Sequence, residues 1–236
     1  MKISIILLAY NEEKKISDEI DTIKKIILDR LEDCEFIIAE DGSTDKTKEI
    51  ILEKKKYMNF IYSTSVKRKG VRGAMLESFE IASGEYIFFA DSGKKFDFND
   101  FWKLFEIREK YDLVSALRIS RHDQLYRIFL TKAFNVFLKV TLNSKFKDID
   151  SGFKIFNKKA LKKIIKIKAI NSDFLSAELC LKLQYYKLKF AEIPVKYFSR
   201  KEDSKALPLF IIPKLIMSFL MNFFKLKKQL KTINQI

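Results

Sequence analysis

Residues 3–13 read ISIILLAYNEE, residues 36–45 read FIIAEDGSTD and residues 86–93 read YIFFADSG. Each segment opens with a nearly continuous apolar run, which is typical of a parallel strand covered on both faces. Each run then ends in a turn that carries carboxylates. Amphipathic patterns separate the runs, and the clearest has an isoleucine at every third or fourth position from Ile16 to Ile27. This alternation predicts an α/β fold with a mostly parallel sheet and helices on both faces.

The rest of the chain follows the same periodicities less regularly. Ser43 and Thr44 are expected to cap a helix that runs through Ile50 and Ile51. No internal repeat or linker is evident, so we expect one domain over residues 1–205 and a C-terminal amphipathic helix over residues 206–236. Further strands are expected at residues 60–62, 113–117 and 190–195, and further helices at 74–82, 101–110, 126–142 and 174–186.

Composition excludes several classes of protein. Of the 236 residues 47% are hydrophobic and 14% aromatic, which a disordered chain lacks. Cys34 and Cys180 cannot make a disulfide framework and suggest a reducing compartment. The single histidine, His122, nearly excludes a histidine-rich zinc site. The apolar run at the N-terminus is shorter than a signal-peptide core, so we expect a cytoplasmic location.

The net charge of +15 favours polyanionic partners, unless it reflects only a lysine-rich solvated surface. Nucleic acid is not expected, because no motif that reads bases or backbone is present. Residues 207–224 are the one stretch that approaches the length of a membrane span. Pro208, Pro213 and Lys214 interrupt it, which favours a helix lying in the headgroup region of a membrane, or one packed on the domain.

Acidic groups follow three of the expected strands, where ligands of open parallel sheets bind. They are Glu12, Glu40, Asp41 and Asp91. Carboxylates gathered on one rim repel one another, so a cation or a hydroxyl-rich ligand such as a sugar would stabilise them. No glycine-rich phosphate loop follows any strand, so phosphate charge must be met by side chains or by metal.

Several motifs occur in an order that resembles the inverting nucleotide-sugar glycosyltransferases of the GT-A fold. They are residues 5–13, 40–45, 84–91, 150–156, 177–179 and 192–195. The later motifs are most similar to the polyprenyl-phosphate sugar synthases, the group that includes the dolichol-phosphate mannose synthases. The resemblance runs from Ile3 to about Lys205. It implies a nucleoside-diphosphate sugar as donor, a polyprenyl phosphate as acceptor, and a peripheral position on the cytoplasmic face of the membrane.

The resemblance also implies roles for residues. Asp91 begins the family's aspartate-x-aspartate motif, which holds Mg²⁺ or Mn²⁺ on the diphosphate, but Gly93 replaces the second aspartate. Metal use would then depend on Asp91 alone, or Lys94 or Lys95 would neutralise the diphosphate without metal. The residues expected to bind the donor nucleotide are Ala9, Tyr10, Glu12, Glu40, Asp41, Arg72 and Ser92.

The acceptor side is expected to be basic. Arginine binds phosphate through two parallel hydrogen bonds and stays charged when partly desolvated. We expect Arg118 and Arg127 to act with Asp91 in catalysis. The residues expected to bind the acceptor are Arg121, Asp150, Ser151, Arg200 and Lys205.

Acceptor chemistry suggests the mechanism. A phosphate monoester, with a second pKa of about 6, is already anionic at neutral pH and can attack the anomeric carbon without a strong base, inverting its configuration. Two rival functions stay open. One is transfer to a saccharide hydroxyl, which needs a carboxylate base, and the other is a non-catalytic binding module, which Gly93 makes plausible. The sequence does not determine the sugar, the nucleotide or the oligomeric state.

Overall fold

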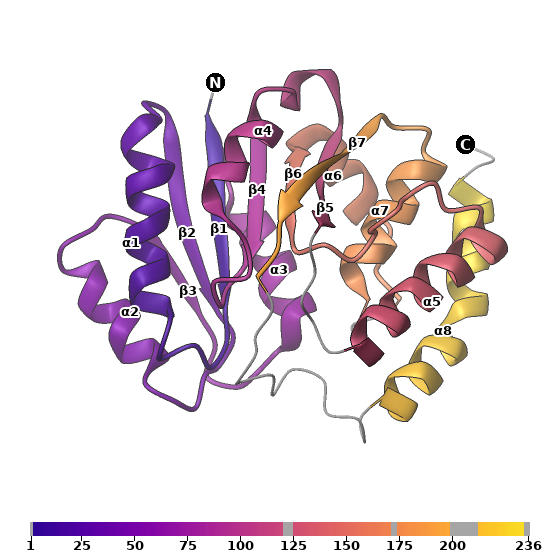
Figure 1. Cartoon of the computed structure of the whole chain (residues 1–236), viewed down its shortest axis with the longest axis horizontal. Helices are drawn as coiled ribbons and strands as arrows, with labels where there is room; N and C mark the ends of the chain where they lie inside the picture. The colour runs from indigo at the N-terminus through magenta and orange to yellow at the C-terminus, as the bar shows by residue number, and fades with distance from the viewer. Residues whose placement is uncertain (1, 120–124, 171–173, 199–211, 234–236) are drawn as a thin grey trace.

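A mixed seven-stranded sheet with helices on both faces forms the centre of the molecule (Figure 1). The structure is a computed structural model that describes residues 2–119, 125–170, 174–198 and 212–233. The strand order is β3-β2-β1-β4-β6-β5-β7, and only the two pairs that involve β6 are antiparallel. The predicted α/β class is confirmed. The strands are β1 (Ile3–Ala9), β2 (Cys34–Glu40), β3 (Ile61–Thr64), β4 (Tyr86–Asp91), β5 (Leu113–Ile119), β6 (Phe153–Asn157) and β7 (Phe190–Lys196).

The helices of the described residues lie between and after these strands. Short 3₁₀ turns occur at Leu28–Arg30, Phe98–Asp100 and Arg108–Lys110. The α-helices are α1 (Ile16–Ile26), α2 (Thr47–Lys55), α3 (Gly70–Ile81), α4 (Phe101–Phe105), α5 (Leu125–Leu142), α6 (Lys158–Ile165), α7 (Leu175–Tyr185) and α8 (Ile212–Ile233).

Two apolar layers cover the sheet. Ile5 and Leu7 of β1 belong to the layer that contains α1, α2 and α4. Ile6 and Leu8 belong to the opposite layer, which contains α3 and α5 to α8. All seven residues of β1 are buried, which explains why its sequence is apolar everywhere except Ser4 rather than alternating.

Strand β6 was not expected from the sequence. It lies between β4 and β5 and runs against both, so that Ala90 pairs with Phe153 and Val114 with Ile155. The lysine at its second position, Lys154, conceals the apolar pattern, although its side chain is fully buried. Helix α6 was also missed, and the helix expected at residues 101–110 is instead α4 followed by a 3₁₀ turn.

The expected capping by Ser43 and Thr44 is wrong. Helix α2 begins at Thr47, whose backbone N–H donates to Asp45 Oδ1 at 3.0 Å. The Ser43 hydroxyl instead accepts from the Asn11 N–H at 3.0 Å, and the Thr44 N–H donates to Asn11 Oδ1 at 2.9 Å. These bonds fasten the loop after β1 to the loop after β2.

The C-terminal helix α8 packs on the second apolar layer beside α5 and α7 (Figure 1). Phe219 stacks edge-on against Phe134 and Phe137 of α5, at centroid distances of 5.3 and 5.7 Å. Buried α8 residues also include Phe223, Leu226, Leu230 and Ile233. In the part of the chain that the structure describes, no helix has both the length and the apolar character needed to cross a bilayer.

Candidate active site

The acidic turns meet at one edge of the sheet, as the sequence predicts. Ala9 at the end of β1 pairs with Glu40, and Leu8 pairs with Asp91. Because β6 is antiparallel, the residues before its first strand position reach the same edge, and the Asp91 N–H donates to the Gly152 carbonyl at 2.9 Å. A cavity of about 180 Å³ opens there. Its lining consists of Val71 and Met75 from α3, Phe89, Asp91, Asp150, Gly152, Leu175 and Ser176.

Gly152 allows Asp91 to lie in this cavity. A Cβ atom at position 152 would fall on the Asp91 carboxylate, well inside van der Waals contact. The Asp91 side chain is about one-third exposed, so it stays accessible from the cavity. The contact between Asp91 and the segment before β6, which the sequence did not predict, thus includes a direct backbone hydrogen bond.

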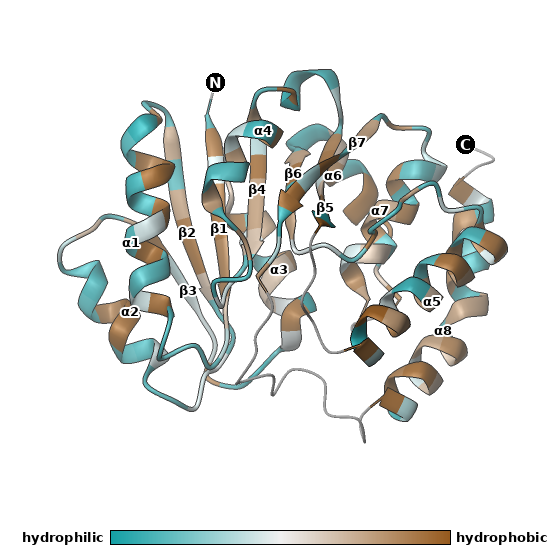
Figure 2. Ribbon diagram, viewed as in Figure 1, coloured by the Kyte–Doolittle hydropathy of each residue, from teal (hydrophilic) through white to brown (hydrophobic). Residues whose placement is uncertain are grey.

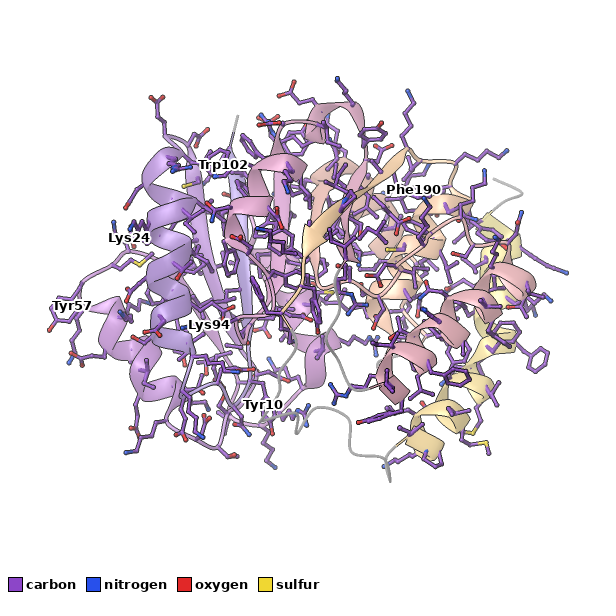
Figure 3. All side chains as sticks on the ribbon, in the orientation of Figure 1. Tyr10, Lys24, Tyr57, Lys94, Trp102 and Phe190 are labelled. Atoms are coloured by element: carbon purple, nitrogen blue, oxygen red, sulfur yellow. The ribbon has the colours of Figure 1, made fainter. Side chains whose placement is uncertain are left out.

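Tyr10 and Asp41, both expected to bind the donor, are brought together by a residue that the sequence did not indicate. The Arg68 guanidinium lies 4.1 Å from the Tyr10 ring centroid, and its Nε is 3.9 Å from Asp41 Oδ2. Asp41 Oδ1 also accepts from the Lys69 N–H at 2.7 Å. Figure 3 labels Tyr10, which lies at the edge where the central strands end. The only indication of Arg68 in the sequence is a run of basic residues before α3. Such a run is equally typical of a solvated surface.

Glu40, the last residue of β2, and Glu12, in the loop after β1, are buried at this edge. Glu40 accepts a hydrogen bond from the Ser43 N–H and another from the Thr64 hydroxyl, the latter at 2.7 Å, and Lys48 Nζ lies 3.7 Å away. The Glu12 N–H donates to the Thr47 hydroxyl at 2.8 Å. Their donor-binding roles stay predictions.

The loop after β4 is fixed by Glu19, an acid on the apolar side of α1. Its carboxylate accepts from the N–H groups of Gly93 and Lys94, at 2.8 and 3.1 Å. Burial raises the pKa of Glu19 to about 7, despite the opposing effect of these two donors. Glu19 was not predicted as a functional residue, although an acidic residue among the isoleucines of an amphipathic helix indicates a buried carboxylate.

Arg118, expected to act in catalysis, forms a bidentate ion pair with Asp148. Its Nε and Nη2 lie 2.7 and 2.6 Å from the two carboxylate oxygens, and its own N–H donates to Asp148 Oδ2 at 3.1 Å. Burial alone would raise the pKa of Asp148, but the guanidinium outweighs it and holds that pKa below its usual range. The pair ties the end of β5 to the segment before β6.

Arg127, near the start of α5, is half-buried, and its guanidinium makes fewer hydrogen bonds than that of Arg118. Its Nε donates to the Tyr126 hydroxyl at 3.3 Å, while its Nη2 is buried and bonds to nothing among the described residues. The Ser151 hydroxyl is likewise buried without a partner in the described part of the chain. Arg121, Arg200 and Lys205 lie outside the described residues, so their expected acceptor contacts stay predictions.

Arg72, expected to bind the donor, does not line the Asp91 cavity. It lines a neighbouring cavity of about 180 Å³ between α3, α7 and the segment after α6. Its Nη2 donates to the Ala169 carbonyl at 3.3 Å. Leu175 lines both cavities.

A fully buried lysine lies behind the Asp91 cavity. Lys154 Nζ donates to the Ile149 carbonyl at 3.1 Å, to the Ser151 carbonyl, and to the Ser176 hydroxyl at 2.8 Å. These bonds hold the segment that carries Asp150. Asp150 is exposed and lines the cavity, and partial desolvation by the protein around its carboxyl raises its pKa, with Asp91 nearby adding to the effect.

The model of a family described as glycosyl transferase family 2 matches residues 4–165, more than half of the chain. The chain belongs to glycosyl transferase family 2. The matched part contains β1 to β6, and with them Asp91, Arg118 and the Asp150 segment.

Two relatives of this family 2 chain have names that specify a lipid phosphate as substrate. A dolichyl-phosphate beta-glucosyltransferase of Dictyostelium discoideum is 23% identical over 216 residues, covering 83% of this chain and 66% of the relative. An undecaprenyl-phosphate 4-deoxy-4-formamido-L-arabinose transferase of Photorhabdus laumondii is 26% identical over 140 residues, covering 58% and 43%. The chain therefore spans less than two thirds of the length of these relatives.

A solved structure shares the GT-A fold of this family 2 chain. Glucosyl-3-phosphoglycerate synthase from Mycobacterium tuberculosis, solved with Mn²⁺, uridine diphosphate and phosphoglyceric acid, superposes with a TM-score of 0.70 at 20% identity. The superposition covers 94% of this chain and 78% of the synthase. At this identity the likeness establishes the fold alone.

The residues at the expected metal position do not fit a divalent cation well. Gly93 has no side chain, and the Asp91 carboxylate is paired with Lys95, whose Nζ lies 3.4 Å from Oδ2. Among the described residues no three His, Cys, Asp or Glu side chains are grouped so that they could hold a metal ion.

Proposed function

We propose that this chain transfers a sugar from a nucleoside-diphosphate sugar to a polyprenyl phosphate, with inversion, at the cytoplasmic surface of a membrane. The main support for this proposal is the position of an acidic cavity next to an arginine and an exposed apolar helix. An acid-lined cavity at the ends of the strands adjoins the end of β5, and the next helix, α5, begins with a half-buried arginine and continues with exposed apolar side chains. Membership of family 2 and the names of the two relatives support the same substrates.

The donor would lie across the ends of β1, β2 and β4. Tyr10 and Arg68 offer a stacked pair of flat groups for the nucleoside, and Asp41 offers an acceptor for hydroxyl groups beside them. Asp91 lies further along the same edge, where the sugar and the diphosphate would sit.

The chemical step would be an in-line displacement. An oxygen of the acceptor phosphate forms a bond to the anomeric carbon, while the bond from that carbon to the diphosphate oxygen breaks. The electron pair leaves with the nucleoside diphosphate, and the configuration inverts. Because the attacking phosphate is already anionic, the protein needs to align the reactants and stabilise the leaving group rather than remove a proton.

Arg127 is our candidate ligand for the acceptor phosphate. Its Nη2 is buried without a partner in the described residues, and an unmet buried donor is costly unless a ligand supplies the acceptor. Two guanidinium nitrogens of Arg118 already donate hydrogen bonds to Asp148. We propose that Arg118 positions the end of β5 and that Arg127 contacts the phosphate.

Exposed apolar side chains on α5 and α8 would meet the membrane. The two helices lie side by side, and Figure 2 shows hydrophobic colouring over both. An exposed apolar patch of this kind marks an interaction surface, and the exposed lysines of both helices would attract anionic headgroups. The exposed apolar residues are Leu125, Phe129, Val136 and Val140 on α5, and Ile216, Met217, Leu220, Met221 and Phe224 on α8.

Transfer assays test the reaction. The purified chain would be incubated with UDP- and GDP-sugars and a short polyprenyl phosphate, with product followed by mass spectrometry. We expect a product that depends on lipid phosphate, and we expect Arg127→Met to lower its rate while nucleoside-diphosphate affinity changes less than about threefold. Equal loss of nucleotide binding would contradict the acceptor role of Arg127. No transfer with any donor would contradict the function.

Vesicle sedimentation tests the membrane surface. We expect binding to vesicles of phosphatidylglycerol and phosphatidylcholine, and its loss when Phe129 and Phe224 are both replaced by serine. Tyr57, 81% exposed on the far side of the molecule (Figure 3), offers a matched control, because Tyr57→Ser removes an exposed aromatic outside this surface. Unchanged sedimentation of the double variant would contradict the assignment.

Asp150 favours a second candidate, transfer to a saccharide hydroxyl. Such an acceptor needs a general base, and Asp150 lines the cavity with a raised pKa, which suits that task. Asp150→Asn separates the two functions. A hydroxyl acceptor predicts a loss of about 10²–10⁴-fold in turnover, whereas a phosphate acceptor predicts a much smaller change.

A further inference from the structure

The turn after β4 has a backbone conformation that suits glycine at position 93. Gly93 has a φ of 101° and Lys94 a φ of 52°, so two successive residues lie in the left-handed half of backbone space. The buried Glu19 carboxylate accepts from both of their N–H groups. An aspartate at position 93 would be strained in this turn, so the departure from the family motif is part of the local fold.

The side chains of the two lysines in this turn, Lys94 and Lys95, pair with different carboxylates. The Lys94 ammonium lies 2.7 Å from Asp18 Oδ2 on α1, and both side chains are about half-exposed or more. The Lys95 ammonium points back to Asp91, at 3.4 Å from Oδ2, and the Lys95 side chain is only 23% exposed. Of these two lysines, Lys95 therefore stands beside the carboxylate at which the related enzymes' motif begins.

We propose that Lys95 neutralises the diphosphate of the donor in place of a divalent metal, and that Asp91 orients its ammonium. This inference rests on the proposed function. An ammonium has three N–H donors, and Asp91 takes one of them. The other two are available to phosphate oxygens in the described structure. As the sugar–oxygen bond breaks, negative charge grows on the diphosphate oxygen, and a fixed cation there stabilises the transition state more than the ground state.

Nucleotide binding in the presence and absence of metal tests the inference. Isothermal titration with UDP and with GDP would be run in chelator and in Mn²⁺, on the wild type, Lys95→Met and Lys95→Arg. The matched control is Lys94→Asn, which removes the neighbouring ammonium and keeps a residue that tolerates a left-handed backbone. Mn²⁺ binding to the wild type would be followed by electron paramagnetic resonance, and transfer rates would be measured in parallel.

We expect wild-type affinity for the preferred nucleotide to change less than about threefold between chelator and Mn²⁺. Lys95→Met should weaken it by about tenfold or more and lower the transfer rate by about 10²–10³-fold, the usual effect of losing one charge-stabilising donor. Lys95→Arg should retain most of the affinity, and Lys94→Asn should behave as the wild type. Thermal melting would check that each variant is folded.

The possible failures are distinguishable. If the wild type binds nucleotide only with Mn²⁺, or Lys95→Met binds as tightly as the wild type, the role of Lys95 is wrong and the proposed function survives. If neither nucleotide binds under any condition, the proposed function fails and this inference fails with it.

Discussion

Replacing Arg118 by methionine should destabilise the fold as well as affect the reaction. The side chains of Arg118 and Asp148 are only 10% and 7% exposed, and three hydrogen bonds from Arg118 end on the Asp148 carboxylate. Arg118→Met leaves a buried carboxylate without its main partner. Breaking a buried pair in this way costs about 3–5 kcal/mol. For a chain of this size the loss corresponds to a fall in Tm of about 6–20 °C.

The assay is a double-mutant cycle measured by thermal and urea unfolding. The cycle joins Arg118→Met, Asp148→Leu and the double variant, which replaces the pair by apolar groups and should recover most of the lost stability. Lys24→Met is the matched control, because Lys24 and Asp29 form an ion pair whose side chains are about half-exposed. Its loss should cost less than about 1 kcal/mol.

One result would refute this reasoning. If Arg118→Met melts within about 2 °C of the wild type yet abolishes transfer, the ion pair contributes little and Arg118 is free to bind the acceptor phosphate. The catalytic role expected from the sequence would then stand.

Three further predictions concern the cavity edge. The contribution of Glu19 to folding stability should fall by about 3 kcal/mol as pH rises from about 4.5 to 7, because its pKa is raised to about 7 and the unfolded chain ionises first. Urea titrations should show this slope in the difference in unfolding free energy between the wild type and Glu19→Gln. Gly93→Asp should lower stability by about 1–3 kcal/mol, because φ at this position is 101°, and calorimetry with Mn²⁺ should still detect no metal bound at this turn. Gly152→Ala should displace the Asp91 carboxylate and slow transfer by about 100-fold. Its Tm should change little, because the end of the Asp91 side chain can move aside. An unchanged transfer rate would count against Asp91 as part of the site.

Local patterns were sufficient for the first half of the fold. Strands β1, β2 and β4 contain the continuous apolar runs 5–9, 36–39 and 86–90 because helices cover both of their faces, and such runs are visible without coordinates. Their parallel order then places the residues that follow at one edge, so the meeting of Glu40 and Asp91 near β1 could be predicted. The second half was harder, because β6 carries the buried Lys154 and does not show a strand's apolar pattern.

The sequence by itself determined the α/β class, the acidic edge and the family resemblance, because each depends on residues close together in the chain. Only the tertiary structure decided which charges meet. Asp148 pairs with Arg118 across 30 residues, and Glu19 holds Gly93 across 74 residues. Such partners are chosen by how strands and helices pack, and a charge in the sequence carries no record of which opposite charge, backbone donor or open cavity will lie beside it.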